Sequence, residues 1–145
     1  MKKNVQGILH SNQTVVSLIQ RVLDMFFIIF GLYLTISYLK LDWGIQQSAI
    51  SAIALTLFNF SSGFDDLYIS WRGLSPYKEM KKITTHLFVS FGVIYIFSTF
   101  ITPHYQISES LMLIWFVATL LLLLSYRIIL RLLLASLRSN GFNTR

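Results

Sequence analysis

The sequence predicts an all-α integral membrane protein, a four-transmembrane-helix bundle with amphipathic interfacial helices at its N- and C-terminal ends. Composition is the first indication: hydrophobic residues make up 54% of the 145 residues and charged residues 12%, against about 25% charged in an ordinary globular chain. The second indication is that the charges leave four long uncharged stretches. The third is that eleven of the twelve Lys and Arg residues flank these stretches on one side.

Each uncharged stretch predicts one membrane-spanning helix, because crossing about 30 Å of hydrocarbon takes about 20 helical residues. The expected spans lie near residues 22–39, 45–63, 83–101 and 109–126. This divides the chain into a flexible cytoplasmic tail over 1–13, a four-helix transmembrane domain over 14–126, and a basic juxtamembrane helix and hinge over 127–145. Amphipathic segments are expected to lead into the first span and to follow the fourth.

The distribution of positive charge predicts the orientation. The basic residues lie before the first span, between the second and third, and after the fourth, with Lys40 alone on the other side. The positive-inside rule therefore predicts a multi-pass protein with both termini in the cytoplasm.

Several side chains are candidates for packing within the membrane. Small residues in the second span (Ser48, Ala49, Ser51, Ala52 and Ala54) favour close helix approach, and Gly31 and Thr35 of the first span are expected to face them. The leucine run 120–124 is expected to face lipid. The dipeptide Ser75-Pro76 predicts the start of the third helix, with Ser as N-cap and Pro at the first position.

Arg127, Arg131 and Arg138 are the candidate binding residues of the last helix. They lie within about 40° of one another on a helix, and leucines separate them. This pattern predicts a basic amphipathic helix whose arginines contact anionic lipid. Asp24, at the edge of the first span, is interpreted as an interface ion pair with Arg21, with a proton or ion site as the alternative.

Sequence motifs give no candidate catalytic or metal-binding residues. There is no Gly-rich phosphate loop, no HExxH and no Ser/His/Asp set with a known spacing. The carboxylates of Asp65 and Asp66 would point about 100° apart on a helix, so a solvated turn is preferred to a metal site. The absence of cysteine excludes disulfides and thiolate metal sites.

Three stretches carry a resemblance to a known family. They are Ser17–Asp24 before the first span, Leu137–Arg145 after the fourth, and the loop Asp66-Leu67-Tyr68-Ile69-Ser70-Trp71-Arg72-Gly73. They resemble the N-terminal membrane region of the bacterial polyprenyl-phosphate sugar-1-phosphate transferases that initiate exopolysaccharides. In this resemblance Asp66, Tyr68, Ser70, Trp71, Arg72 and Gly73 form the family signature loop.

The resemblance implies a membrane-anchor domain in the bacterial inner membrane. Enzymes of this family transfer a hexose-1-phosphate from a UDP-sugar to undecaprenyl phosphate in exopolysaccharide or capsule biosynthesis, and Mg²⁺ is expected for them. Their catalytic residues follow the membrane region in a Rossmann-like module and a catalytic domain. The sequence stops at Arg145, so this chain is expected to be a fragment or a truncated relative, without catalytic residues or a cofactor of its own and inactive alone.

The expected partners are membrane lipids, undecaprenyl phosphate, the downstream domains of the parent enzyme and a second copy of the chain, with no nucleic acid. Two alternatives remain open. One is a stand-alone four-span scaffold or interaction protein. The other is a small transporter, which would need paired polar groups in mid-membrane, and only Asn59, Ser61 and Ser62 approach that pattern.

Overall fold

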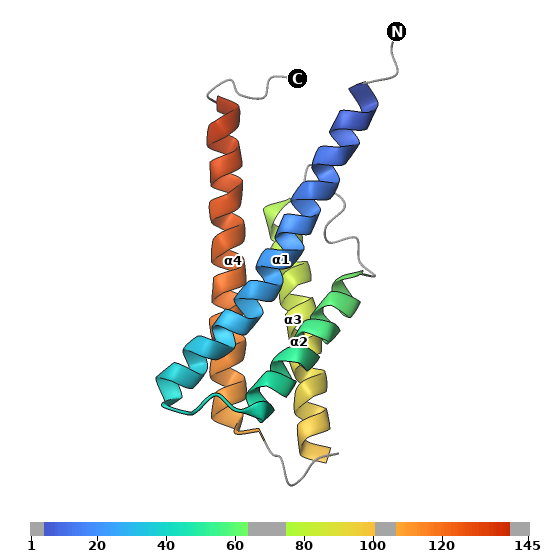
Figure 1. Ribbon diagram of the computed structural model, residues 1–145. Helices are drawn as coiled ribbons and strands as arrows, with labels where there is room; N and C mark the ends of the chain where they lie inside the picture. The colour runs from blue at the N-terminus through green and yellow to red at the C-terminus, as the bar shows by residue number, and fades with distance from the viewer. Residues whose placement is uncertain (1–4, 64–74, 101–106, 140–145) are drawn as a thin grey trace.

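The computed structural model describes residues 5–63, 75–100 and 107–139, with side chains described for 17–63, 75–100, 107–133 and 136. All regular secondary structure in the described part is α-helical, which confirms the predicted all-α class. Its four helices are α1 (Val5–Leu39), α2 (Ile45–Gly63), α3 (Pro76–Phe100) and α4 (Glu109–Ser139) (Figure 1).

Three of the helices begin where the sequence predicts, and one of them is α4, which starts at Glu109. Helix α2 has the expected bounds, and α3 starts at Pro76, where the backbone N–H of Lys78 donates to Ser75 Oγ over 3.4 Å. This bond satisfies one of the free N–H groups of the first turn, so the expected N-cap is confirmed.

Helices α1 and α4 are longer than the predicted spans, because each includes the amphipathic segment that was expected beside it. Helix α1 begins at Val5, so residues 5–13 are helical where a flexible tail was expected, and α4 passes the expected boundary at residue 127 and continues to Ser139. Neither helix contains proline, the residue that most strongly interrupts a helix. The two amphipathic ends are therefore continuations of the long helices rather than separate interfacial helices.

The helices form a ring in which each packs against two neighbours. The most extensive packing is between α1 and α4 and between α2 and α3, while α3 with α4 and α1 with α2 complete the ring. One end of the bundle holds the starts of α1 and α3 and the finish of α4 (Figure 1). We call it the basic end, because Lys78, Lys81, Arg127 and Arg131 lie there.

Three of the helices are long and apolar enough to cross a membrane, and the segments concerned are Ser17–Leu39, Pro76–Phe100 and Glu109–Leu133. Helix α2 has 19 residues, about 28 Å at 1.5 Å per residue. Its ends carry polar residues (Gln46, Gln47, Asn59, Ser61 and Ser62), which lower its apolarity. The structure therefore supports three of the four predicted spans by length and composition.

Trp115 of α4 is the largest buried side chain in the core. Its indole Nε1–H donates to the backbone carbonyl of Ile28 in α1 over 3.0 Å, and its ring lies 4.5 Å from the ring of Phe91 in α3, centroid to centroid. A buried indole N–H needs a hydrogen-bond acceptor in an apolar interior. Trp115 thus joins α4 to both of its neighbours, α1 and α3.

Candidate functional site

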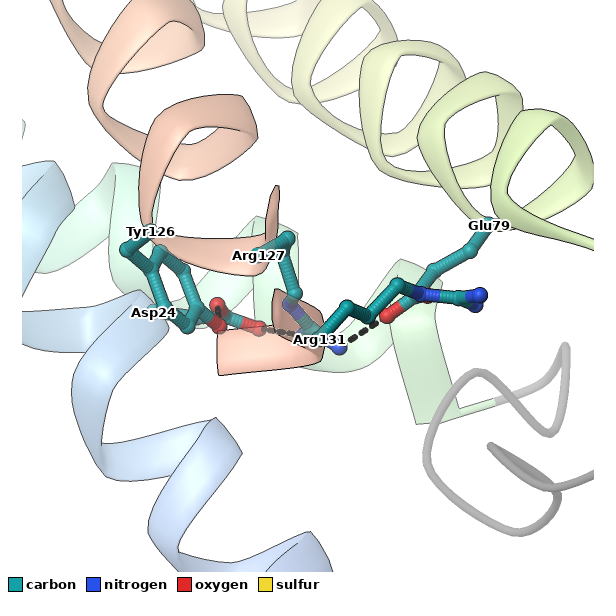
Figure 2. Close-up of polar contacts among 5 residues, drawn as sticks. All are labelled: Asp24, Glu79, Tyr126, Arg127 and Arg131. Atoms are coloured by element: carbon teal, nitrogen blue, oxygen red, sulfur yellow. Dashed lines mark hydrogen bonds and ion pairs between the residues drawn. The ribbon is translucent and has the colours of Figure 1, made fainter. Parts of the chain in front are cut away.

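Five polar side chains converge near the basic end of the bundle, and we call them the charged cluster (Figure 2). Helix α1 supplies one of them, α3 one and α4 three. The members of the charged cluster are Asp24, Glu79, Tyr126, Arg127 and Arg131.

Arg127 is the centre of the charged cluster, because its guanidinium joins two carboxylates on different helices. Its Nη2 lies 2.7 Å from Asp24 Oδ2 of α1, and its Nη1 lies 2.6 Å from Glu79 Oε1 of α3. Charged groups at these distances form the stronger class of hydrogen bond. Helix α4 is therefore fastened to both α1 and α3 through one side chain.

The remaining contacts bind the second oxygen of each carboxylate. The Tyr126 hydroxyl donates to Asp24 Oδ1. Arg131 Nε donates to Glu79 Oε2 over 2.9 Å, and its Nη2 pairs with the same oxygen. Both oxygens of each carboxylate thus have a partner on α4.

The charged cluster is buried and electrically balanced. Asp24 is 0% exposed, Arg127 2% and Glu79 5%, and two positive groups face two negative groups. Desolvating a charge costs several kcal/mol, and a buried pair recovers this only where its geometry and hydrogen bonds are good. The arrangement therefore makes the packing of α1, α3 and α4 interdependent: separating them would expose unpaired charge to an apolar surrounding.

The structure places the predicted lipid-binding arginines differently from the sequence prediction. Arg127 lies inside the bundle, so its predicted position on the lipid surface is corrected: the face it shares with Arg131 points toward α1 and α3. The Arg131 side chain is 28% exposed and pairs with Glu79. The side chain of Arg138 lies outside the described residues, so its contact with anionic lipid stays a prediction.

Asp24 has two partners on α4 that its interpretation as an interface partner of Arg21 did not include. Its two carboxylate oxygens are bound by Tyr126 and Arg127, 102 and 103 residues away in the sequence. Glu79 was missed as a member of the site because three lysines surround it in the sequence. The available indication was that an ionisable residue within a membrane helix is expected to have a specific partner.

The signature loop, Asp66, Tyr68, Ser70, Trp71, Arg72 and Gly73, lies outside the described residues, as do Asp65 and the hinge after Ser139. Within the residues that are described, no three His, Asp or Glu side chains are grouped so that they would hold a metal ion. In the described structure, the charged cluster joins α4 to α1 and α3.

Comparison with known proteins identifies one matching family model, described as a CoA-binding domain, over residues 63–145. The coenzyme belongs to the description of the family. In this chain, the described part of the match consists mainly of the two apolar helices α3 and α4. No solved structure matches the chain significantly.

Two curated bacterial enzymes are similar to almost the whole chain. A UDP-glucose:undecaprenyl-phosphate glucose-1-phosphate transferase of Klebsiella pneumoniae is 25% identical over 140 residues, which is 94% of this chain and 29% of the enzyme. The enzyme of the same name from Escherichia coli K12 is 26% identical over 139 residues, 93% of this chain and 29% of the enzyme. The chain thus spans less than a third of the length of the relatives it matches.

Proposed function

The chain belongs to the family described as a CoA-binding domain, and from this membership together with its two relatives we propose that it is the membrane-anchor region of an undecaprenyl-phosphate sugar-1-phosphate transferase. The complete enzyme would transfer a hexose-1-phosphate from a UDP-sugar to undecaprenyl phosphate, as the names of the relatives state for glucose. This transfer would initiate an exopolysaccharide or capsule.

One observation carries the proposal: the similarity to both relatives extends over more than nine-tenths of this chain. A resemblance confined to one apolar helix would have little meaning, because apolar helices resemble one another by composition alone. A match through four helices and their connections is more specific. It supports a shared membrane region.

The geometry of the charged cluster fits an anchor better than a catalytic site. Both carboxylates are bound by arginine and withdrawn from solvent, so neither is positioned to bind a metal-phosphate complex. The same contacts hold α4 against α1 and α3. A rigid bundle would fix the direction in which α4 leaves the membrane toward any domain that follows it.

The proposal also covers the orientation of the chain in the membrane and its binding partners. We place the chain in the bacterial inner membrane with α2 as a fourth span, both termini in the cytoplasm, and the signature loop facing the cytoplasm beside the catalytic part. Mg²⁺ and the undecaprenyl carrier would be bound by that catalytic part. The eleven-to-one distribution of basic residues supports this orientation.

A domain exchange tests the anchor function. The region of the E. coli relative that matches this chain is replaced by residues 1–145, and glucose-1-phosphate transfer to undecaprenyl phosphate is measured in isolated membranes. We expect the chimera to insert and to retain transfer, whereas a chimera carrying Arg127→Met should lose both. A chimera that inserts at the normal level but transfers no sugar would contradict the proposal and favour the alternative of a separate scaffold protein.

A further inference from the structure

A groove of about 410 Å³ runs between α3 and α4 on the outside of the bundle. Its lining is mostly aromatic and aliphatic: Phe88, Phe91, Gly92, Tyr95, Met112, Leu113 and Phe116, with Glu109. Gly92 leaves the middle of the groove open, because a β-carbon at this position would have no atom within 4 Å. Within a membrane such a groove contacts hydrocarbon chains.

Two lysines of α3 lie above this groove, at the basic end. Lys78 and Lys81 are exposed. At 3.6 residues per turn, Lys81 lies about 20° from both Phe88 and Gly92 around the helix axis. Lys78 lies about 40° from Gly92 and about 80° from Phe88 on the same side of the helix. Glu79 does not neutralise them at the surface, because it points into the bundle and pairs with Arg127 and Arg131. The same stripe of α3 is therefore positively charged at its start and apolar below.

The length of this stripe matches one leaflet of a bilayer. Lys81 and Tyr95 are fourteen residues apart, about 21 Å at 1.5 Å per residue. Half of a bilayer, headgroups included, is about 20–22 Å thick. At the far end the groove is bordered by Glu109, whose negative charge disfavours an anionic group there and so gives the site a direction.

We propose that this groove binds an anionic phospholipid, with the phosphate headgroup on Lys78 and Lys81 and an acyl chain along Phe88, Gly92 and Tyr95. The two positive charges favour an anionic headgroup, and the apolar lining favours a hydrocarbon chain attached to that headgroup. Inorganic phosphate has no such chain and would not occupy the groove. The chain of a polyprenyl carrier is longer than a leaflet and would extend past Glu109. The assignment requires only that the bundle is in a membrane and does not depend on sugar transfer.

Native mass spectrometry of the full chain in detergent tests the proposal, with phosphatidylglycerol and phosphatidylcholine of identical acyl chains as probes. We expect phosphatidylglycerol to bind more tightly. Each lysine near the surface contributes about a fivefold preference, so K78Q/K81Q should reduce phosphatidylglycerol affinity about 25-fold and leave phosphatidylcholine unchanged. The matched control K40Q removes a lysine at the opposite end of the bundle and should change neither.

A second pair of variants tests the groove itself. Gly92→Leu should fill it and weaken the binding of both lipids while keeping the ratio of their affinities. Ala52→Leu places the same side chain on an exposed position of α2 and should have no effect. Equal binding of the two lipids by the wild type, or an equal loss with K40Q, would overturn the proposal. Undecaprenyl phosphate is the third probe: displacement of phosphatidylglycerol at an equal concentration, lost with the same variants, would assign the groove to the carrier lipid and also overturn it.

Discussion

Gly31 of α1 lies directly against the backbone of Thr119 of α4. A β-carbon at position 31 would come within 3.2 Å of the Thr119 Cα and 3.3 Å of its Cβ, closer than side chains normally approach. The sequence predicted that Gly31 faces the small residues of α2, but the contact is with α4. Small residues at such crossings let helices pack closely in a membrane, where the hydrophobic effect does not drive association.

We therefore expect Gly31→Ala to destabilise the bundle. Overpacking costs about 1–3 kcal/mol, and rotation of the Thr119 hydroxyl does not remove the contact with the backbone. Thermal unfolding in detergent measures the effect. Gly92→Ala is the matched control, since it adds the same methyl group to α3 with no atom within 4 Å, and it should be neutral or stabilising. An equal loss in both variants would contradict the prediction, because it would show that the close α1–α4 contact at Gly31 is not the cause.

The charged cluster gives a graded prediction for the three helices that it joins. Arg127→Met leaves Asp24 and Glu79 buried without their shared cation, and breaking a buried pair in this way costs about 3–5 kcal/mol. Arg131→Met should cost less, because this side chain is 28% exposed and Glu79 keeps Arg127. Lys81→Met, at an exposed position of α3, is the control.

The measurement is the denaturant or temperature midpoint of each variant in the same detergent. The expected order of stability is Lys81→Met, then Arg131→Met, then Arg127→Met as the least stable. If Arg127→Met unfolds at the wild-type midpoint, the cluster does not hold the helices together. Tyr126→Phe removes one donor to Asp24 and should fall between the control and Arg127→Met.

The sequence predicted the helices better than their contacts. The bounds of α2 and the start of α3 follow from charges, Ser75 and Pro76, which act locally. The inward faces do not follow, because lipid is as apolar as the interior of the bundle and hydropathy does not separate the two. Leu123, in the run expected to face lipid, is 0% exposed.

The charged cluster shows the same limitation for polar residues. The spacing of Arg127 and Arg131 predicted that they share a face of the helix. Spacing alone does not determine whether that face contacts lipid or the other helices. Opposite charges on other helices determined that direction, and Asp24 and Glu79 lie more than 45 residues from Arg127 in the sequence. A search for one carboxylate partner for each arginine within the apolar segments would have suggested the pairing.

The turn after α1 gives a stabilising prediction. Lys40 has a positive φ of 55°, and the N–H groups of Lys40 and Leu41 donate to the carbonyls of Ser37 and Ile36 over 3.3 and 3.0 Å. This is a Schellman motif, in which glycine is the usual residue at the position of Lys40. Lys40→Gly should raise stability by about 1 kcal/mol, measured as a higher unfolding temperature. Lys40→Ala, which keeps the strain, should not raise it.

Cysteine labelling tests whether α2 crosses the membrane. Asp42→Cys and Ser75→Cys lie at the two ends of the segment that contains α2, and Ser139→Cys marks the finish of α4. If α2 spans, a membrane-impermeant maleimide added to intact cells should label Asp42→Cys and leave the other two unlabelled until the cells are opened. Labelling of Asp42→Cys and Ser75→Cys from the same side would show that α2 does not cross.

The last prediction is that residues 1–145 alone transfer no sugar phosphate. Phosphoryl transfer depends on positioning and on cations that stabilise the phosphate charge, and a Mg²⁺ site normally uses one or two carboxylates together with substrate phosphates. At the basic end the described carboxylates are Asp24 and Glu79, and both are buried and bound by Arg127. The purified chain should therefore release no UMP from UDP-glucose in the presence of undecaprenyl phosphate and Mg²⁺. Turnover above a protein-free blank that is abolished by Asp65→Asn with Asp66→Asn would contradict this, because it would assign a catalytic role to these two carboxylates.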